Sequence, residues 1–284
     1  PNGGFGLWIE SEGNAYLTAY VVETMHEAET AGYSIDKNIM TKAITFMKNF
    51  IKNNQLVGDK LAFNANNRAY ILYVLSEIGQ GDLGLNNNLW EIRKNLSLIS
   101  KAYLAMAYQN LIETKPDQSI QDKINSLLKE LENAALQTPR GVSFEEVNLD
   151  YSLFDSNTRT TAVVMKALNR IQSENPLIPK ILQALLKERQ GGHFSTTQET
   201  AVSLLALIEY LKTSKELSPA YNGIITINGK EVLNKDYTSA NLFDTARVEI
   251  SLKDLLGNNL DNEIAAQKIG QGKMYVDMNM EYYL

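Results

Sequence analysis

The sequence lacks cysteine and has few of the residues that catalytic sites use most often. Its 284 residues include no Cys, two His and two Trp. Disulfides, thiolate metal ligands and a cysteine nucleophile are therefore excluded within these residues, although this does not identify a compartment. Phosphate-loop, dinucleotide, zincin and serine-hydrolase motifs are also absent. We therefore expect no catalytic, cofactor-binding or metal-binding residue in this sequence.

Clustered positive charge is also scarce. The formal net charge is −6, and short basic clusters such as Lys187–Arg189 lie among acids. Nucleic acids and anionic membranes attract clustered Lys and Arg, so we expect no nucleic-acid partner. No apolar run approaches the ~20 residues that cross a bilayer, and no signal-peptide pattern follows Pro1. The 44% apolar content predicts a globular chain with a sizeable core, and we expect it to be part of a longer protein.

The hydrophobic pattern changes character near residue 214. Before it, apolar residues recur at helical spacing, and after it short alternating runs predict strands, with Asn228-Gly229 as a hairpin signal. We therefore expect a helical region over 1–213, a linker over 214–219 and a β segment over 220–284. The expected strands are Gly223–Asn228, Val232–Tyr237, Ala246–Leu252, Asn262–Ile269 and Met274–Tyr283.

Two kinds of helix alternate in the first region. Segments around Ala15, Ala69, Ala102, Ala162 and Ala201 are apolar on nearly all faces, which is typical of helices enclosed by others. Their mean spacing of about 47 residues is in the range of helical-hairpin repeats. This alternation predicts a mainly α fold, an α/α toroid of the terpenoid-cyclase type, and leaves an open solenoid as the alternative. The amphipathic helices expected between them are Lys37–Asn53, Gln118–Ala135 and Pro176–Arg189.

Gly-rich turns with an aromatic residue precede several of the enclosed helices. They are Gly3–Trp8, Gly141–Phe144 and Gly191–Phe194. Glycine permits positive φ there, and we expect each aromatic to close the end of the helical ring.

The most informative run is Gly191–Ala201, which reads Gly-Gly-His-Phe-Ser-Thr-Thr-Gln-Glu-Thr-Ala and opens a Leu/Ala-rich helix. It resembles the last helical repeat of the thioester domain in the α2-macroglobulin and complement superfamily. Other segments along the chain are similar to that family in the same order, and Asn175–Lys180 resembles its bacterial members. These segments are Gly4–Trp8, Tyr16–Val22, Ala28–Tyr33, Gly270–Val276 and Glu281–Leu284.

The resemblance implies a secreted or periplasmic broad-spectrum protease inhibitor that encloses its target after cleavage of a bait region. The implied partners are proteases, bound by the full-length parent, and other domains of that parent, with any membrane anchor outside these residues. In thioester-bearing members a Cys-x-Glu-Gln group couples to the protease, but it precedes every segment that matches here. Neither its Cys nor its Gln has a position in this sequence, and Gln198 belongs to the last-repeat motif.

In domain terms, the resemblance implies the later helices of a thioester domain followed by part of a CUB-like β-domain. Some relatives carry a residue in a mid-domain loop that tunes the reactivity of the thioester. The matching region of this sequence is about Asn53–Asn67, and no residue in it is assigned to that position. A scaffold that binds only other parts of the same parent is a further interpretation.

The alternative from another class is an α/α-toroid enzyme that acts on glycans. Sugar-cleaving toroids use two carboxylates, so a glycosidase or lyase would use the acids near residues 145–155. We favour a structural role, because acids before a helix favour its dipole and Ser or Asp commonly caps it. The Asp-x-Asp-Asp motif of terpene cyclases and the zinc-binding Cys of prenyltransferases are absent. The candidate carboxylates are Glu145, Glu146, Asp150 and Asp155.

The two histidines are weaker candidates for chemistry. His193 lies in a predicted helix-entry loop, and no spacing nominates a partner for proton transfer. His26 lies on a predicted helix between Met25 and Glu27. We expect structural or surface roles for both.

Overall fold

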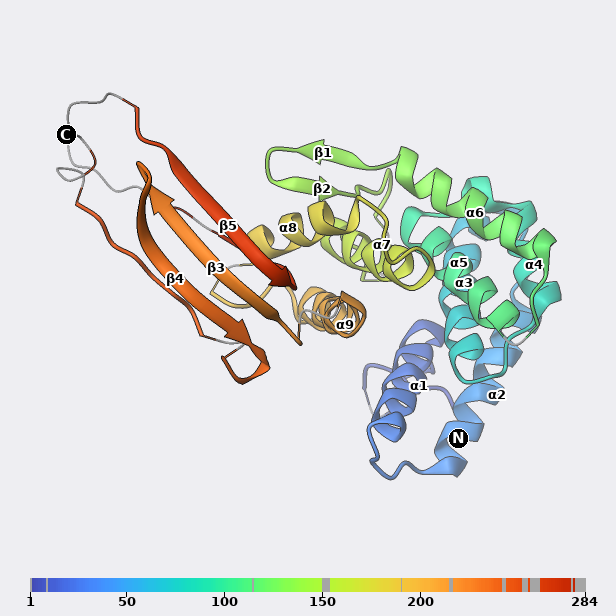
Figure 1. The fold of residues 1–284 in the computed structure, drawn as a ribbon. Coiled ribbons are helices and arrows are strands. Elements are labelled where there is room, and N and C mark those ends of the chain that lie inside the picture. Colours follow the sequence, from blue (N-terminus) through green and yellow to red (C-terminus); the bar gives the residue numbers. More distant parts are fainter. Residues whose placement is uncertain are drawn as a thin grey trace. The chain divides into compact units, whose positions relative to one another are not determined.

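The computed structural model describes residues 2–8, 10–113, 115–149, 154–189, 191–214, 217–241, 244–251, 255, 261–276 and 278, apart from the side chain of Asp59. It divides into two compact units, Pro1–Glu209 and Tyr210–Leu284. The first is mainly helical and the second contains a small antiparallel sheet (Figure 1). The expected class, a mainly α chain followed by a small β region, is confirmed.

Nine helices are found among the described residues, eight of them within the first unit, while α9 begins there and extends into the second, which also contains the 3₁₀ turn at Ser239–Asn241. Their bounds are α1 Ala15–Thr30, α2 Lys37–Asn53, α3 Leu61–Glu77, α4 Leu83–Glu91, α5 Leu98–Glu113, α6 Gln118–Asn133, α7 Asn157–Ile171, α8 Ile178–Glu188 and α9 Thr197–Ser214, with short 3₁₀ turns at Gly58–Lys60, Arg93–Asn95 and Ser239–Asn241.

Capping residues explain where the amphipathic helices begin. The Asp36 carboxylate accepts hydrogen bonds from the backbone N–H groups of Asn38 and Ile39, and α2 coincides with the expected Lys37–Asn53. Asp117 starts α6 in the same way. Each cap satisfies backbone donors that the helix itself leaves unpaired. The starts of these helices are therefore decided by short-range chemistry that the sequence displays.

Two of the enclosed helices, α3 and α7, are buried on all sides over most of their length, as their sequences predict, whereas α1 is exposed at Thr24, Glu27 and Thr30. Every residue of α3 from Asn67 to Ser76 is buried, and so is every residue of α7 from Arg159 to Asn169. Helix α9 differs, because Leu204, Leu205 and Ile208 are 48%, 39% and 47% exposed. Among the described residues, the prediction of burial on nearly all faces therefore fails for α9.

The enclosed helices pack against one another in chain order. Helix α1 packs on α3, α3 on α5 and α5 on α7, while α2, α6 and α8 contact α1, α5 and α7, respectively. Figure 1 shows α3 and α5 side by side with α4 and α6 next to them. A central series of helices is thus covered by amphipathic ones, which bury one face each.

A short hairpin leads from α6 to α7. Strand β1 (Leu136–Thr138) pairs with β2 (Gly141–Ser143), and a Cβ on Gly141 would lie 2.3 Å from the carbonyl oxygen of Lys180. Glycine is required there by this close approach and by its φ of +128°. The aromatic residues after the second and third Gly-rich turns, Phe144 and Phe194, are buried. The first turn contains two aromatic residues, of which Phe5 is half-buried and Trp8 is 80% exposed.

The second unit is built on a three-stranded sheet of order β4-β3-β5 (Figure 1). Strands β3 (Ala220–Ile227) and β4 (Lys230–Thr238) form a hairpin whose turn residues, Asn228 and Gly229, have φ values of 51° and 77°. This is the backbone geometry that the Asn-Gly pair predicts. Strand β5 (Ile264–Gln271) pairs antiparallel with the other edge of β3.

Two of the expected strands are not found in the described residues. Residues 246–251 form no strand, and residue 252 lies outside the described part. Residues 274–276 and 278 form none either, and the rest of Met274–Tyr283 is not described. Alternation of apolar and polar residues marks a face that a sheet could bury, but a strand also needs a hydrogen-bonding neighbour, which the pattern does not reveal.

One buried side chain in α4 yields a stability prediction. Asn86 is fully buried, and neither its Oδ1 nor its Nδ2 has a hydrogen-bond partner in the described part of the chain. An unsatisfied buried polar group costs about 1–3 kcal/mol. We expect Asn86→Leu, which is similar in size, to raise the melting temperature of the helical unit in calorimetry.

The adjacent Asn87 provides the matched control. Its Oδ1 accepts hydrogen bonds from Tyr108 at 2.9 Å and Lys123 at 2.7 Å. We expect Asn87→Leu to lower the melting temperature, because both partners lose their acceptor. A lower melting temperature for Asn86→Leu as well would contradict the prediction.

Candidate functional site

A cluster of tyrosines lies where α1, α3 and α5 meet. Tyr16 and Tyr70 have ring centroids 4.9 Å apart, Tyr70 and Tyr103 are also 4.9 Å apart, and Tyr73 lies 5.1 Å from Tyr103. All four rings are buried. Burial raises the pKa of Tyr16 to about 12, and it raises the pKa of Tyr70, Tyr73 and Tyr103 well above 10. These phenols are therefore neutral near pH 7.

Glu23 of α1 connects this cluster to α7. Its Oε2 accepts a hydrogen bond of 2.6 Å from the Tyr70 hydroxyl, and its Oε1 lies 3.6 Å from the Lys166 ammonium. Lys166 is only 8% exposed and also lies 5.3 Å from the centre of the Tyr73 ring. A buried ammonium thus has a carboxylate and an aromatic face as compensation for lost hydration.

Arg170 joins three helices at one guanidinium. Its Nη1 donates to Glu77 of α3 at 2.7 Å, and its Nε donates to Glu209 of α9. Asn110 of α5 donates a further hydrogen bond of 2.5 Å to Glu77. Burial opposes the charge of Glu77, but Arg170 and the hydrogen bonds outweigh it, so the pKa of Glu77 is lowered. The pKa of Arg170 is raised, although burial opposes this, because Tyr73, Glu209 and Glu77 favour its charged form.

Arg159 lies in the first turn of α7. Its side chain is 1% exposed, lies 3.7 Å from Asp155 and donates to the Tyr16 hydroxyl and to the carbonyl oxygen of Phe154. Arg159, Lys166 and Arg170 are spaced at i, i+7 and i+11, which places them on one face of α7. We call these three cations, with Glu23, Glu77, Glu209 and the four tyrosines, the buried network.

The buried network connects α1, α3, α5, α7 and α9 through hydrogen bonds, ion pairs and ring contacts. Its phenols are neutral, and each carboxylate has a cationic or hydrogen-bonding partner. In the part of the chain that the structure describes, no group of three or more His, Asp or Glu could hold a metal ion. The Tyr73 hydroxyl is buried without a hydrogen-bond partner among the described residues, but the charged groups of the network are paired, and paired buried polar groups favour one arrangement of the helices.

The candidate carboxylates near residue 150 occupy different local structures. Glu146 accepts hydrogen bonds from the backbone N–H groups of Leu98 and Ile99, both at 2.9 Å, and from the Thr160 hydroxyl. It therefore caps α5. Asp155 pairs with Arg159, whereas Glu145 is exposed. Asp150 lies outside the described residues. The structure thus places Glu146 at the start of α5, which is not the helix that follows it in sequence, and Asp155 in an ion pair with Arg159, which the sequence pattern did not predict.

The remaining residues singled out by sequence lie away from the buried network. His193 is exposed, and its Nδ1 lies 2.8 Å from the carbonyl oxygen of Phe194. His26 is half-buried on α1. Gln198 is in the first turn of α9, where its Oε1 is buried without a hydrogen-bond partner among the described residues. None of these positions brings two titratable groups together at a cleft.

Sequence reasoning missed the charged half of the buried network. Its cations, Arg159, Lys166 and Arg170, were not singled out. Their helical spacing on an otherwise apolar segment is a signal that could have found them, because cations on an enclosed face need carboxylates from neighbouring helices.

The chain is similar to parts of two curated proteins. No family model matches it. It is 22% identical over 293 aligned residues to an α2-macroglobulin homolog of Nostoc, an alignment that covers 100% of this chain and 14% of that protein. It is 24% identical to chicken ovostatin over 268 residues, covering 85% of this chain and 18% of ovostatin.

Solved structures of bacterial α2-macroglobulins have the same fold. The trypsin-activated protein of Escherichia coli matches with a TM-score of 0.58 and 20% identity, over 85% of this chain and 16% of that one. The Salmonella protein reacted with methylamine matches with a TM-score of 0.60 and 18% identity, over 85% of this chain and 15% of that one. An E. coli fragment from domain MG7 to the C-terminus matches with a TM-score of 0.58 and 16% identity, over 95% of this chain and 36% of that one.

These similarities define a chain with the α2-macroglobulin type of fold. The resemblance that the motifs indicate is confirmed by two curated α2-macroglobulin-type relatives and by the bacterial structures. This chain spans 14% and 18% of the length of the two curated relatives.

The first prediction for the buried network concerns Arg170. Arg170→Met leaves Glu77 and Glu209 buried without their shared cation, and breaking a buried pair costs about 3–5 kcal/mol. Because the Arg170 side chain is 23% exposed, we expect a smaller loss of about 2–4 kcal/mol. Urea unfolding followed by circular dichroism measures it. Arg189→Met, at an exposed position, is the control, and equal effects of the two substitutions would contradict the prediction.

The second prediction is a pH dependence. The lowered pKa of Glu77 means that its stabilising effect is complete above its ordinary pKa of 4.5 and is lost as the pH falls through the lower folded-state value. We expect Glu77→Gln to reduce the melting temperature at pH 7 and to flatten its decline below pH 4.5. The exposed Glu188→Gln is the control. A decline as steep as that of the unsubstituted chain would refute this role of Glu77.

Proposed function

We propose that this chain is part of an α2-macroglobulin-like broad-spectrum protease inhibitor, and that the inhibitor traps proteases after its bait region is cleaved. The observation that carries the proposal is the alignment of the whole chain with a small part of the Nostoc α2-macroglobulin homolog. The shared fold of the bacterial structures supports it.

Within that protein, we assign residues 1–213 to the later helices of a thioester domain and residues 220–284 to a CUB-like β-domain, joined by residues 214–219. The packing of α1, α3, α5 and α7 in chain order, with amphipathic helices outside, supports an α/α toroid as the architecture. The buried network then lies among the inner helices. Its role would be to keep the thioester domain rigid while the rest of the inhibitor changes shape.

The proposed location is outside the cytoplasm, either periplasmic or secreted. This follows from the class of protein, because an inhibitor of foreign proteases must meet them there. Over the residues that the structure describes, no helix has both the length and the apolar character to cross a membrane.

The glycan-acting enzyme is not favoured. A pair of carboxylates that cleaves a glycosidic bond must flank the substrate, with one of them protonated. Glu146 instead accepts two backbone hydrogen bonds at the start of α5, and Asp155 pairs with the buried Arg159. We therefore propose a role without catalytic turnover.

The test uses the full-length parent. We expect a broad-specificity protease to cleave the bait region and compact the protein, seen as faster migration in native gels and a smaller radius in scattering. The same protease with its active site blocked is the control and should have no effect. If the parent carries a thioester, methylamine releases one thiol and protease treatment gives covalent adducts. Compaction without thiol release would indicate a purely steric trap.

An absence of compaction after complete bait cleavage would contradict the proposal. In that case a scaffold that binds only other domains of its parent would explain the fold better.

A further inference from the structure

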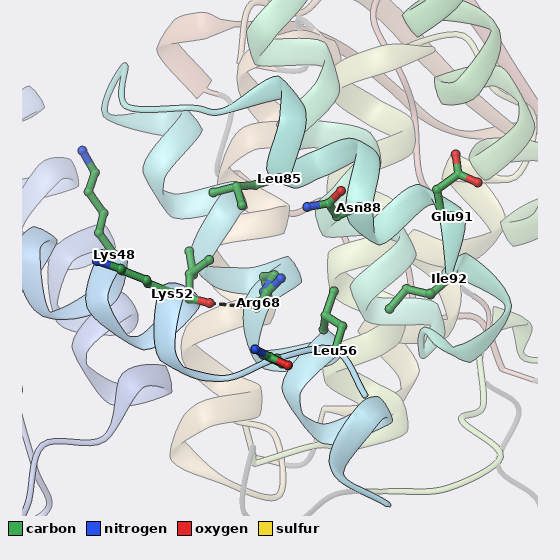
Figure 2. A pocket seen from close by; sticks show the side chains of 10 residues that line it. Lys48, Lys52, Leu56, Arg68, Leu85, Asn88, Glu91 and Ile92 are labelled. Atoms are coloured by element: carbon green, nitrogen blue, oxygen red, sulfur yellow. Dashed lines mark hydrogen bonds between the residues drawn. The ribbon is translucent and has the colours of Figure 1, made fainter. Parts of the chain in front are cut away.

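A surface pocket of about 580 Å³ lies between the C-terminal end of α2, the middle of α3 and the length of α4. Its walls are largely apolar, and Leu56, Leu85 and Ile92 face its interior (Figure 2). Polar groups enter it from Arg68 of α3 and from the amides of Gln55 and Asn88. A few polar groups in an apolar hollow of this size are typical of small-molecule sites.

Arg68 is the unusual group in this pocket. The residue is 6% exposed, yet no carboxylate in the described part of the chain lies within ion-pair distance of it. Its Nη2 donates to the carbonyl oxygens of Ile51 at 2.9 Å and Asn54 at 2.5 Å, at the end of α2. This explains its position but uses only two of the five N–H donors of a guanidinium. The donors on Nε and Nη1 have no acceptor among the described residues.

The surroundings of Arg68 favour an anion. Lys48 and Lys52 also line the pocket, and Glu91 is the one carboxylate among its described lining residues. Figure 2 shows Glu91 on the far side, with its carboxylate directed away from Arg68. The lining holds three cations and one carboxylate, in a chain whose net charge is −6, but the Lys48 ammonium donates to Gln80 at 2.8 Å and points away from Arg68 (Figure 2). Burial lowers the pKa of Arg68.

The groups that line the pocket limit the chemical class of ligand that it can bind. A guanidinium recognises a carboxylate through parallel N–H donors, and the leucine and isoleucine walls would remain in contact with water if the ligand were a bare anion. We propose that this pocket binds a carboxylate attached to a short aliphatic group, with Arg68 holding the carboxylate and Leu56, Leu85 and Ile92 surrounding the aliphatic part. Free aliphatic acids and the C-terminal residue of a peptide ending in Leu or Ile share this chemistry.

The test is titration calorimetry on the chain with hexanoate, with an acetylated Gly-Gly-Leu peptide, and with the C-terminal amide of that peptide. We expect binding of hexanoate, of the acid peptide, or of both, and none of the amide. Acid peptide binding more tightly than hexanoate assigns the pocket to chain ends, and the reverse assigns it to free acids. Failure of both acids to bind, or equal binding of the peptide amide, would overturn the proposal.

Variants connect the binding to this pocket. Asn88 is exposed on α4, so Asn88→Asp places a competing carboxylate opposite Arg68 without removing its contacts to α2. We expect at least about tenfold weaker binding, equivalent to about 1.4 kcal/mol. Asn38→Asp makes the same charge change at the opposite end of α2 and should leave binding unchanged. Equal loss in both variants would show that only net charge matters and would refute the site.

Arg68→Met removes the anion-binding group itself. Its melting temperature shows whether the capping of α2 is lost, and Asn88→Asp provides the answer if Arg68→Met does not fold. A folded Arg68→Met variant that still binds hexanoate with unchanged affinity would overturn the proposal. None of these outcomes depends on protease trapping, so the pocket and the proposed function are tested separately.

Discussion

The contact of Arg170 with Glu77 and Glu209 is the interaction on which the helical unit most depends. One guanidinium on α7 binds carboxylates from α3 and α9, and Asn110 of α5 holds one of those carboxylates in place. Removing one partner of a buried ion pair costs about 3–5 kcal/mol, because a charge is left buried without compensation. The ion pairs of Arg170 therefore favour the observed contacts of α7 with α3 and α9.

The sequence was sufficient to predict most of the architecture. Asp36 and Asp117 are visible cap residues, the apolar surroundings of Ala69 and Ala102 indicate enclosed helices, and Asn228-Gly229 indicates a hairpin. These signals depend on residues close together in sequence, so they can be recognised without knowledge of the tertiary fold. The segment over residues 246–251 was wrongly predicted as a strand because strand formation depends on a neighbour that lies elsewhere in the chain.

The polar interior was harder to predict for the same reason. Arg170 meets Glu77 across 93 positions of sequence, and Arg159 meets Tyr16 across 143. A single sequence shows that a buried cation needs a partner but not which carboxylate supplies it. Arg68 is the converse case, because its proposed role depends on the absence of an ion-paired carboxylate among the described residues around it. Only the three-dimensional arrangement of α2, α3 and α4 reveals that pocket.

The network and the family resemblance point in one direction. In the described part of the helical unit, the charges of Lys166 and Arg170 on α7 are paired with carboxylates from neighbouring helices, and the fold is that of bacterial α2-macroglobulins. The ion pairs of α7 are expected to stabilise its packing against α3 and α9. A double-mutant cycle on Arg170→Met and Glu209→Gln, measured by urea unfolding at pH 7, tests this most directly. We predict a coupling energy above about 1 kcal/mol, whereas additive effects would contradict the account.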